Sequence, residues 1–146
     1  MGLFEHYSPR GLECVCGNLR MAARAVSGIY DRHLKPVGLQ ASQMAVLWAV
    51  AGRRSAPVNE IADVIAMDET TLLRNLRVLE RRRLVAFHVG DDRRQRIVQL
   101  TAEGRAVFEA ALPAWKDAQR AVAKVLDGGN VDEMNHKLVR LTRALR

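Results

Sequence analysis

The chain has 146 residues, enough for one domain or for one compact binding unit with additional helices. Apolar residues make up 49% of the sequence and charged residues 27%, a composition typical of a globular protein rather than of a disordered or fibrous one. No apolar run is long enough to span a membrane, and residues 1–10 lack the pattern of a signal peptide, so we expect a cytoplasmic protein.

The positive charge of the chain indicates an acidic partner. The formal net charge is +7, and arginines, which outnumber lysines, cluster between residues 74 and 96. A guanidinium can bind phosphate oxygens or a guanine edge through paired hydrogen bonds, which an ammonium cannot do as well. A GC-rich genome would also enrich arginine, but it would not concentrate arginine in one segment.

Helical periodicity dominates the first half of the chain. Apolar residues recur at spacings of three or four over residues 12–34, which predicts an amphipathic first helix. A second helix is expected to end at Gly52, a short third helix to include Ile65, and a fourth to continue to about Arg83. These three helices begin with residues that cap or open helices: Ser42, Pro57 and Asp68.

The predicted fourth helix has two faces of opposite character. At about 100° per residue, three leucines share one face: Leu72, Leu76 and Leu79. Threonines and arginines suited to a major groove occupy the opposite face or the first turn: Thr70, Thr71, Arg74, Arg77 and Arg81. We assign Arg74 and Arg77 to base or phosphate contacts and Arg81 to phosphate alone, while Asn75 faces partly inward and is a weaker candidate. A solvated surface helix would show the same basic face.

The apolar period then changes to two. Residues 85–89 alternate in character and residues 96–100 return after a turn, which predicts a β-hairpin. The tip of the hairpin carries Asp92, Arg93 and Arg94 and no bulky apolar side chain. Arginines on a slim hairpin can enter a minor groove, where negative potential is concentrated, and Asp92 can hold one of them in position.

Two helices are expected after the hairpin. Thr101 can cap a long helix to about residue 127, with a kink at Pro113, and a capping box of Asn130 and Glu133 can begin a last helix. The long helix has small residues that permit close helix approach: Ala111, Ala114, Ala118 and Ala121. The last helix has one apolar stripe: Val131, Met134, Leu138, Leu141 and Leu145. Both features favour a homodimer, although they would also suit packing on the chain's own core.

The order of short helix, turn, amphipathic helix and hairpin is that of a winged helix-turn-helix. We therefore expect a mainly α fold with a small β-hairpin wing, in a single unit of residues 1–146. Residues 42–100 are the expected winged helix DNA-binding part, and residues 8–41 and 101–146 are the expected helical dimerisation part.

Several short motifs occur together in this order. Asn-Glu-Ile-Ala at 59–62, Asp-Arg-Arg at 92–94, Leu-Thr at 100–101 and Glu-Gly at 103–104 resemble the MarR family of bacterial repressors. The resemblance covers nearly the whole chain. It implies a homodimer, joined through its first and last helices, that places two recognition helices in successive major grooves of a pseudo-palindromic operator.

The resemblance also assigns roles to individual residues. The residues that match the recognition helix are Thr70, Thr71, Arg74 and Arg77. Asp92 and Arg94 match the wing pair, with Arg94 the minor-groove residue. Three positions depart from the family pattern: Glu69 replaces a basic residue, Leu73 a threonine that often contacts DNA, and Arg83 a glycine before the wing. Leu73 can instead contact a thymine methyl.

Two cysteines are candidates for sensing an oxidant. Cys14 and Cys16 lie where organic-hydroperoxide repressors of this family carry a reactive cysteine, and alignment through Arg24 matches Cys16 to that cysteine. Tyr30 then matches a tyrosine that hydrogen-bonds the cysteine across the dimer, while Ala41 stands where a second tyrosine would be. Residues two apart on a helix point about 200° apart, so oxidation is expected to give a sulfenic acid or an intersubunit bond. Small residues packed at an interface would show the same pattern.

A small aromatic or carboxylate effector is the other candidate signal. Trp48, Tyr30, His33 and the arginines of the first helix could line a cleft between the dimer helices and the winged part, although they would serve a core equally well. The histidines have no metal-ligand spacing and two cysteines do not complete a tetrahedral site, so no metal or cofactor is expected.

Sequence-specific regulation of transcription, as a repressor on double-stranded DNA, is the function these features favour. A non-specific architectural DNA-binding protein would use the same arginines on phosphates but would have no preferred operator. An enzyme is not expected, because the sequence contains no Gly-rich phosphate loop, metal-ligand constellation or nucleophile elbow.

Overall fold

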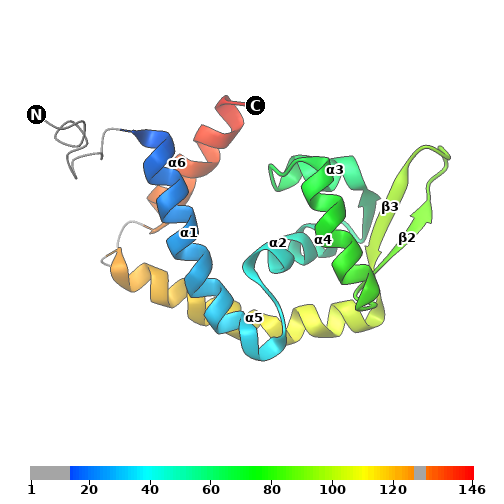
Figure 1. Ribbon diagram of the computed structural model, residues 1–146, viewed down its shortest axis with the longest axis horizontal. Coiled ribbons are helices and arrows are strands. Elements are labelled where there is room, and N and C mark those ends of the chain that lie inside the picture. The colour runs from blue at the N-terminus through cyan, green and yellow to red at the C-terminus, as the bar shows by residue number, and fades with distance from the viewer. Residues whose placement is uncertain (1–13, 127–130) are drawn as a thin grey trace, which may run out of the picture.

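The computed structural model describes residues 14–126 and 131–146 (Figure 1). Its helices are α1 (Val15–Leu34), α2 (Ala41–Ala51), α3 (Val58–Val64), α4 (Glu69–Arg81), α5 (Ala102–Val125) and α6 (Val131–Ala144), with a 3-10 turn at Lys35–Val37. Its strands are β1 (Ser55–Pro57), β2 (Val85–Val89) and β3 (Arg96–Leu100). The mainly α fold with a small wing is confirmed. The predicted helix start near residue 12, the glycine break at 128–129 and the Asn130 cap lie outside the described residues.

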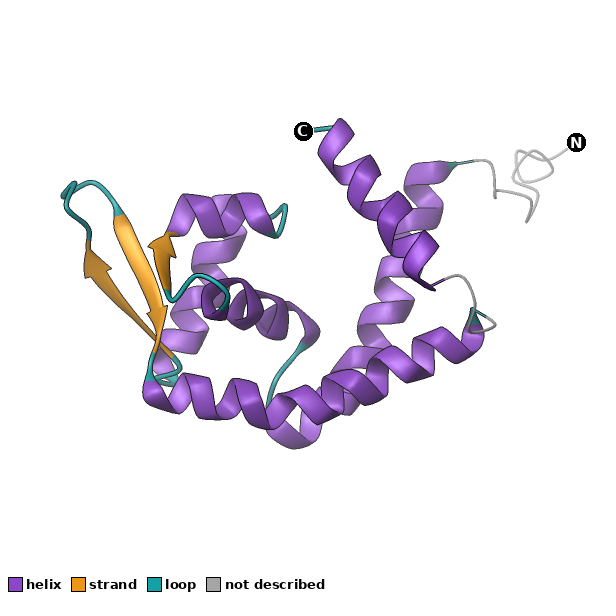
Figure 2. Cartoon of the chain, turned by 180° about the vertical axis from the view of Figure 1, so that it is seen from behind, coloured by secondary structure: helices purple, strands orange, loops and turns teal. Residues whose placement is uncertain are grey.

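The chain forms two lobes that share α5. Helices α2, α3 and α4 and the sheet form one lobe, while α1 and the second half of α5 form the other (Figures 1 and 2). Helix α6 follows α5, and Arg146 just after it donates to Asp63 Oδ1 of α3 at 3.4 Å. Helix α5 runs beneath both lobes and packs along α1, and it continues through Pro113 as one helix. Among the described helices, none combines the length and apolarity needed to span a membrane.

The three strands form an antiparallel sheet in the order β1-β3-β2, and the wing is its β2–β3 hairpin. The predicted hairpin is confirmed: β2 pairs with β3, with Val85 opposite Leu100 and Val89 opposite Arg96. Strand β1 was not predicted, because three residues ending in a proline have no alternation and form a strand only by pairing with the free edge of β3. Pro57 is therefore the residue before α3 rather than part of its first turn.

Two predicted caps are confirmed and one is wrong. The side chains of Asp68 and Thr101 accept hydrogen bonds from the first-turn amides of α4 and α5. Ser42 does not cap α2, which begins one residue earlier. The helix start is satisfied instead by a capping box of Gln40 and Gln43, in which the Gln40 amide donates to Gln43 Oε1 at 3.1 Å, and by Asp31 of α1, whose Oδ1 accepts from the Ala41 amide at 2.7 Å.

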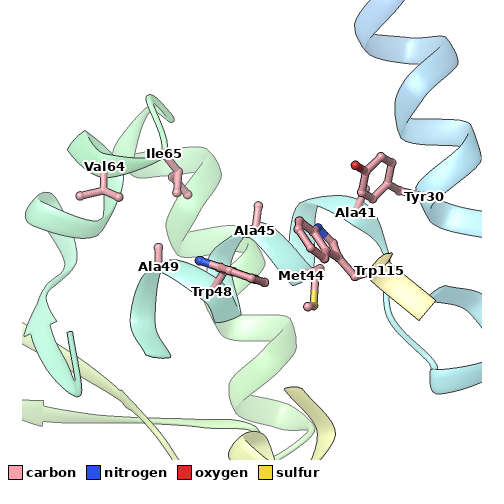
Figure 3. A pocket seen from close by; sticks show the side chains of 9 residues that line it. All are labelled: Tyr30, Ala41, Met44, Ala45, Trp48, Ala49, Val64, Ile65 and Trp115. Atoms are coloured by element: carbon pink, nitrogen blue, oxygen red, sulfur yellow. The ribbon is translucent and has the colours of Figure 1, made fainter. Parts of the chain in front are cut away.

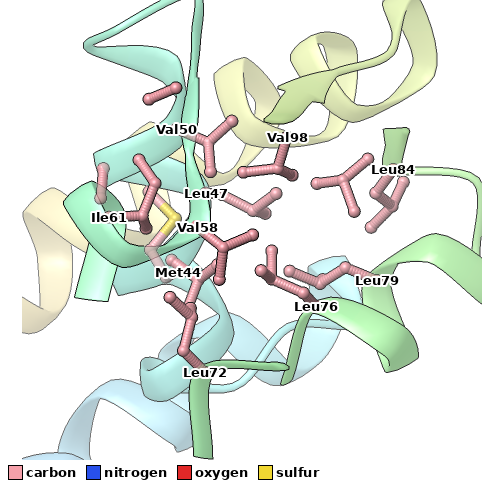
Figure 4. Close-up of a cluster of buried hydrophobic side chains, with 14 of the residues drawn as sticks. Met44, Leu47, Val50, Val58, Ile61, Leu72, Leu76, Leu79, Leu84 and Val98 are labelled. Atoms are coloured by element: carbon pink, nitrogen blue, oxygen red, sulfur yellow. The ribbon is translucent and has the colours of Figure 1, made fainter. Parts of the chain in front are cut away.

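A single apolar core joins α4 to the rest of the winged lobe. The predicted leucine face of α4 is fully buried: Leu72, Leu76 and Leu79. Around it pack side chains from α2, α3 and β3, among them Leu47, Ile61 and Val98 (Figure 4). Helix α4 ends at Arg81 rather than at Arg83, because Arg83 adopts a left-handed backbone with φ of 59°.

The start of α5 lies directly against the backbone between α4 and β2. Thr101 Oγ1 donates to the Arg83 carbonyl at 2.6 Å and accepts from the Gly104 amide at 2.9 Å. The Thr101 amide donates to the Leu84 carbonyl at 3.2 Å. A Cβ on Gly104 would lie 1.8 Å from that same carbonyl oxygen, so only glycine permits this approach.

We predict that Gly104→Ala lowers the free energy of unfolding by about 3 kcal/mol or more, because the methyl group must displace backbone rather than a flexible side chain. Urea denaturation measures the change. Gly52→Ala is the matched control, since a Cβ there meets its nearest neighbour at an ordinary 3.5 Å and the residue already has a helical φ of −66°. Equal unfolding midpoints for the two variants would contradict this account of the junction.

Candidate nucleic-acid interface

Helix α4 presents the basic face that its sequence predicts. Its leucines are buried, whereas Thr70, Arg74, Arg77 and Arg81 are exposed on the other side and Thr71 is half-buried in the first turn. Because the apolar face is fixed in the core, the arginines extend away from the lobe. None of the three arginines forms an ion pair within the described part of the chain.

The N-terminus of α4 is held by Asp68. Its Oδ1 accepts from the Thr71 amide at 2.8 Å. The hydrogen bond from the Thr71 side chain, followed by that from the Thr71 backbone, lowers the pKa of Asp68, and the charge of Arg74 acts in the same direction. The carboxylate therefore remains ionised and orders the first turn, where both predicted DNA-contacting threonines lie.

Two other residues of α4 face the lobe more than the solvent. Asn75 is half-buried, and its Nδ2 donates to the Thr71 carbonyl at 3.0 Å, which agrees with the interpretation that this side chain faces partly inward. Leu73 is half-buried and packs against the core, whereas Glu69 is exposed at the first helical position.

The wing tip is shaped by Asp92. Its Oδ1 accepts from the Arg94 amide at 2.9 Å, its carbonyl accepts from the Gln95 amide at 2.9 Å, and Gln95 in turn accepts from Gly90. Asp92 thus holds Arg94 through the backbone and not through its guanidinium. The side chains of Arg93 and Arg94 are exposed, and neither has an ion-pair partner among the described residues.

Arg96 is an exposed arginine that was not among the predicted site residues. It is the first residue of β3, on the side of the wing that faces α4, and it lines the same hollow as Leu73 and Arg77. The register of the hairpin contained a signal for this position, because Arg96 is two residues before the buried Val98 and so shares its face of the sheet.

The predicted sensor cysteines differ from each other in backbone position. Both are free and exposed, but only Cys16 is inside α1, because Cys14 is the N-cap and its Sγ accepts from the Gly17 amide at 3.3 Å. The expected 200° separation on one helix is therefore wrong. Tyr30 donates to Gln119 of α5 in the same chain, and its burial raises the pKa of its hydroxyl. Its expected contact with Cys16 is one between subunits and stays a prediction.

An apolar pocket of about 420 Å³ lies where the two lobes meet. It is lined by Tyr30, Ala41, Met44, Ala45, Trp48, Ala49, Val64, Ile65 and Trp115 (Figure 3). The rings of Trp48 and Trp115 lie 5.0 Å apart between centroids, and Trp48 is 46% exposed. Of the residues expected at such a cleft, Tyr30 and Trp48 line this pocket, whereas His33 and the arginines of α1 do not. His33 Nδ1 lies 2.9 Å from the Ile29 carbonyl of its own helix.

The two apolar surfaces that favoured a dimer, on α5 and on α6, differ in how far they are exposed to solvent. Ala111 and Ala118 of α5 are fully buried within the single chain, so these two residues follow the alternative of packing on the chain's own core. The stripe on α6 is partly uncovered, with exposed fractions of 39% for Met134, 40% for Leu138 and 37% for Leu141. This leaves the stripe without a complete apolar cover in one chain.

We predict that the stabilising effect of the Asp68 cap depends on pH. A lowered pKa means that the stabilisation is present above the ordinary value of 3.8 and is lost as the pH falls through the pKa of the folded protein. The difference in the free energy of unfolding between the wild type and Asp68→Ala should thus be largest at neutral pH and should shrink in acid. Asp68→Asn, which keeps an accepting oxygen without titrating, is the control. A difference between wild type and Asp68→Ala that is constant with pH would exclude this role.

Comparisons with known proteins agree with this geometry. The Winged helix DNA-binding domain family matches residues 39–104. The transcriptional regulator MosR of M. tuberculosis, solved in complex with DNA, is 34% identical, with a TM-score of 0.82 over 90% of this chain and 96% of MosR. BpsR of Bordetella bronchiseptica is 26% identical, with a TM-score of 0.73 over 91% of this chain and 93% of that one.

Relatives of known sequence are also regulators. The DNA-binding transcriptional repressor ScoC of Bacillus subtilis is 29% identical over 102 residues, which are 69% of this chain and 50% of ScoC. This chain spans between 50% and 66% of the length of the curated relatives it matches. The buried leucine face of α4, the hairpin wing and these similarities together show that the chain belongs to the MarR family of winged helix transcriptional regulators.

Proposed function

We propose that the protein is a sequence-specific repressor that binds a pseudo-palindromic operator as a homodimer. The observation that carries the proposal is that α4 has buried leucines on one face and exposed arginines without ion-pair partners on the opposite face. The tip of the adjacent wing is also basic. A helix of this kind can enter a major groove while an adjacent hairpin enters a minor groove.

Each predicted residue has a role in this proposal. The α4 residues that contact the major groove or its phosphates are Thr70, Thr71, Arg74, Asn75, Arg77 and Arg81. Arg94 enters the minor groove, with Arg93 beside it and Asp92 holding the turn. The winged part of residues 42–100 binds DNA, and residues 8–41 and 101–146 form the dimer.

The partly uncovered stripe on α6 supports dimerisation. Apolar side chains also remain exposed on the first half of α1, including Val15, Leu19 and Met21. Apolar surfaces of this extent are more stable when covered, and a second copy of the chain would cover both helices at once. A two-fold dimer would present two α4 helices about 34 Å apart, the spacing of successive major grooves.

We predict a strong preference for the promoter next to the protein's own gene over random duplex at matched salt, by a factor of about 10³ or more. Arg74→Ala should reduce that ratio by about tenfold or more, since a base contact is lost, while Arg94→Ala should weaken binding at AT-rich flanks. Fluorescence anisotropy measures affinity, and the mass of the complex should correspond to two chains per operator. Arg105→Ala on the exposed face of α5 is the control.

A wild-type ratio near one would instead support a non-specific architectural DNA-binding protein. If the wild type is selective but Arg74→Ala and Arg94→Ala both bind as the wild type does, the assignment of the contact residues is wrong.

The apolar pocket supports an aromatic effector as the signal. Its walls carry no charged side chain, so an unpaired carboxylate would lose its hydration without compensation, whereas an aromatic ring could pack against Trp48 and Trp115. In the similar protein BpsR, 6-hydroxynicotinic acid, an aromatic carboxylic acid, regulates DNA binding, so the comparison supports the aromatic ring of the effector, while the uncharged walls of this pocket favour a ring without a carboxylate. Oxidation at Cys14 or Cys16 is the second proposed signal, because both thiols are exposed.

We predict that phenol, a neutral aromatic probe, quenches tryptophan fluorescence and weakens operator binding at lower concentrations than benzoate does, because the pocket offers no cationic partner. Trp48→Ala should abolish both effects of phenol. Treatment with a hydroperoxide, in the wild type and in Cys16→Ser, tests the alternative. Equal potency of phenol and benzoate would refute the ligand class, and unchanged affinity of the oxidised wild type would refute the cysteine switch.

A further inference from the structure

A groove separates α4 from the wing. It consists of two adjoining hollows of about 390 and 490 Å³ that share Leu73 and Arg96. Charged side chains on the α4 side are Glu69, Arg77 and Glu80, and those on the wing side are Arg94 and Arg96. Helix α4 and the wing, which form its walls, both bind DNA in the proposed function. The geometry of a DNA duplex therefore limits which part of the DNA can lie in this groove.

The register of the hairpin directs Arg96 into the groove. Successive side chains of a strand point to opposite faces of a sheet. Val98 is fully buried and lies opposite Phe87, and Arg96 lies opposite Val89 on the same face two residues earlier. The side chain of Arg96 thus lies on the face of the hairpin that covers the core, just beyond the edge of the core, and faces α4.

The opposite wall is one strip of α4. Leu73, Arg77 and Glu80 are spaced by four and three residues, so they lie above one another on one side of the helix. Leu73 packs against the core and forms the apolar base of the groove, while Arg77 and Glu80 are exposed above it. The groove therefore has an apolar floor with charged rims.

We propose that this groove seats the phosphodiester backbone of one DNA strand, and that Arg96 is a phosphate ligand in it; this rests on the proposed function. In a duplex, one strand's backbone separates each major groove from the adjacent minor groove. With α4 in the major groove and the wing in the minor groove, that backbone must pass between them. The groove that contains Arg96 lies between these two elements, where that backbone would pass.

The charges of the groove fit this occupant and give it a direction. Arg77 and Arg96 have no ion-pair partner within 4.0 Å in residues 14–126 and 131–146, so their guanidinium groups can bind phosphate without first breaking a contact. Glu80 lies in the same hollow and repels phosphate. Its carboxylate would keep the strand toward Arg96 on the wing side.

Binding of the operator and of random duplex by full-length variants, measured over a series of salt concentrations, tests the proposal. Arg96→Gln should weaken binding about tenfold on both duplexes, with the specificity ratio unchanged, and should reduce the slope of log affinity against log salt by about one. Arg96→Lys should keep the wild-type slope. Glu80→Gln should strengthen binding to both duplexes. Arg105→Gln and Glu109→Gln, both exposed on α5, are matched controls.

Two results would overturn the proposal while leaving the proposed function intact. One is wild-type affinity and salt slope in Arg96→Gln although Arg74→Ala loses discrimination. The other is a loss confined to the operator, which would mean that Arg96 contacts bases. Weaker binding by Glu80→Gln would likewise refute the repulsive role of its carboxylate. A wild type without any operator preference would refute the proposed function instead.

Discussion

Burial of three leucines on α4 is the interaction on which the remaining features of the interface depend. A helix on a surface can rotate about its own axis, and Leu72, Leu76 and Leu79 remove that freedom by filling the core beside α2, α3 and β3. Full burial of a leucine contributes about 1.5–3 kcal/mol, whereas an exposed ion pair contributes roughly 0–1 kcal/mol. The apolar face therefore determines which way the helix turns, and the positions of the exposed arginines follow from it.

The junction between α4 and β2 is the second constraint, because it sets the distance between α4 and the wing. Arg83 holds a left-handed backbone there, at a cost of about 1–2 kcal/mol for a residue with a Cβ. The glycine of the family pattern would adopt this backbone without that cost. In this chain the Thr101 hydroxyl bonds the Arg83 carbonyl, and the backbone of Gly104 lies against Leu84. These contacts from α5 offset the strain and hold the wing in place.

Local signals predicted most of the interface, and contacts between distant segments account for what was missed. The caps at Asp68 and Thr101, the leucine face of α4 and the alternation in the hairpin all depend on neighbours within a few residues, and all are as expected. Strand β1 requires the edge of β3, and Asp31 of α1 adds a bond to the start of α2, whose own capping box of Gln40 and Gln43 was also missed. Burial of Ala111 likewise depends on packing between distant segments, which periodicity along α5 does not reveal. Whether a given arginine contacts DNA is a property of the complex, so neither sequence pattern nor exposure determines it.

The position of the apolar pocket relates the two lobes to the interface. Tyr30 and Trp115 come from the α1–α5 lobe, whereas Trp48, Val64 and Ile65 come from the winged lobe. The core that holds α4 also includes Leu34 of α1 and Ala111 of α5, and Tyr30 and Trp115 of the pocket pack against it. Because such a core is close-packed, a ligand that displaces these side chains would change the angle between the two lobes. In a dimer joined through the other lobe, a change in that angle alters the spacing of the two α4 helices. Because successive major grooves have a fixed spacing, such a change would weaken binding to an operator without changing a single contact residue.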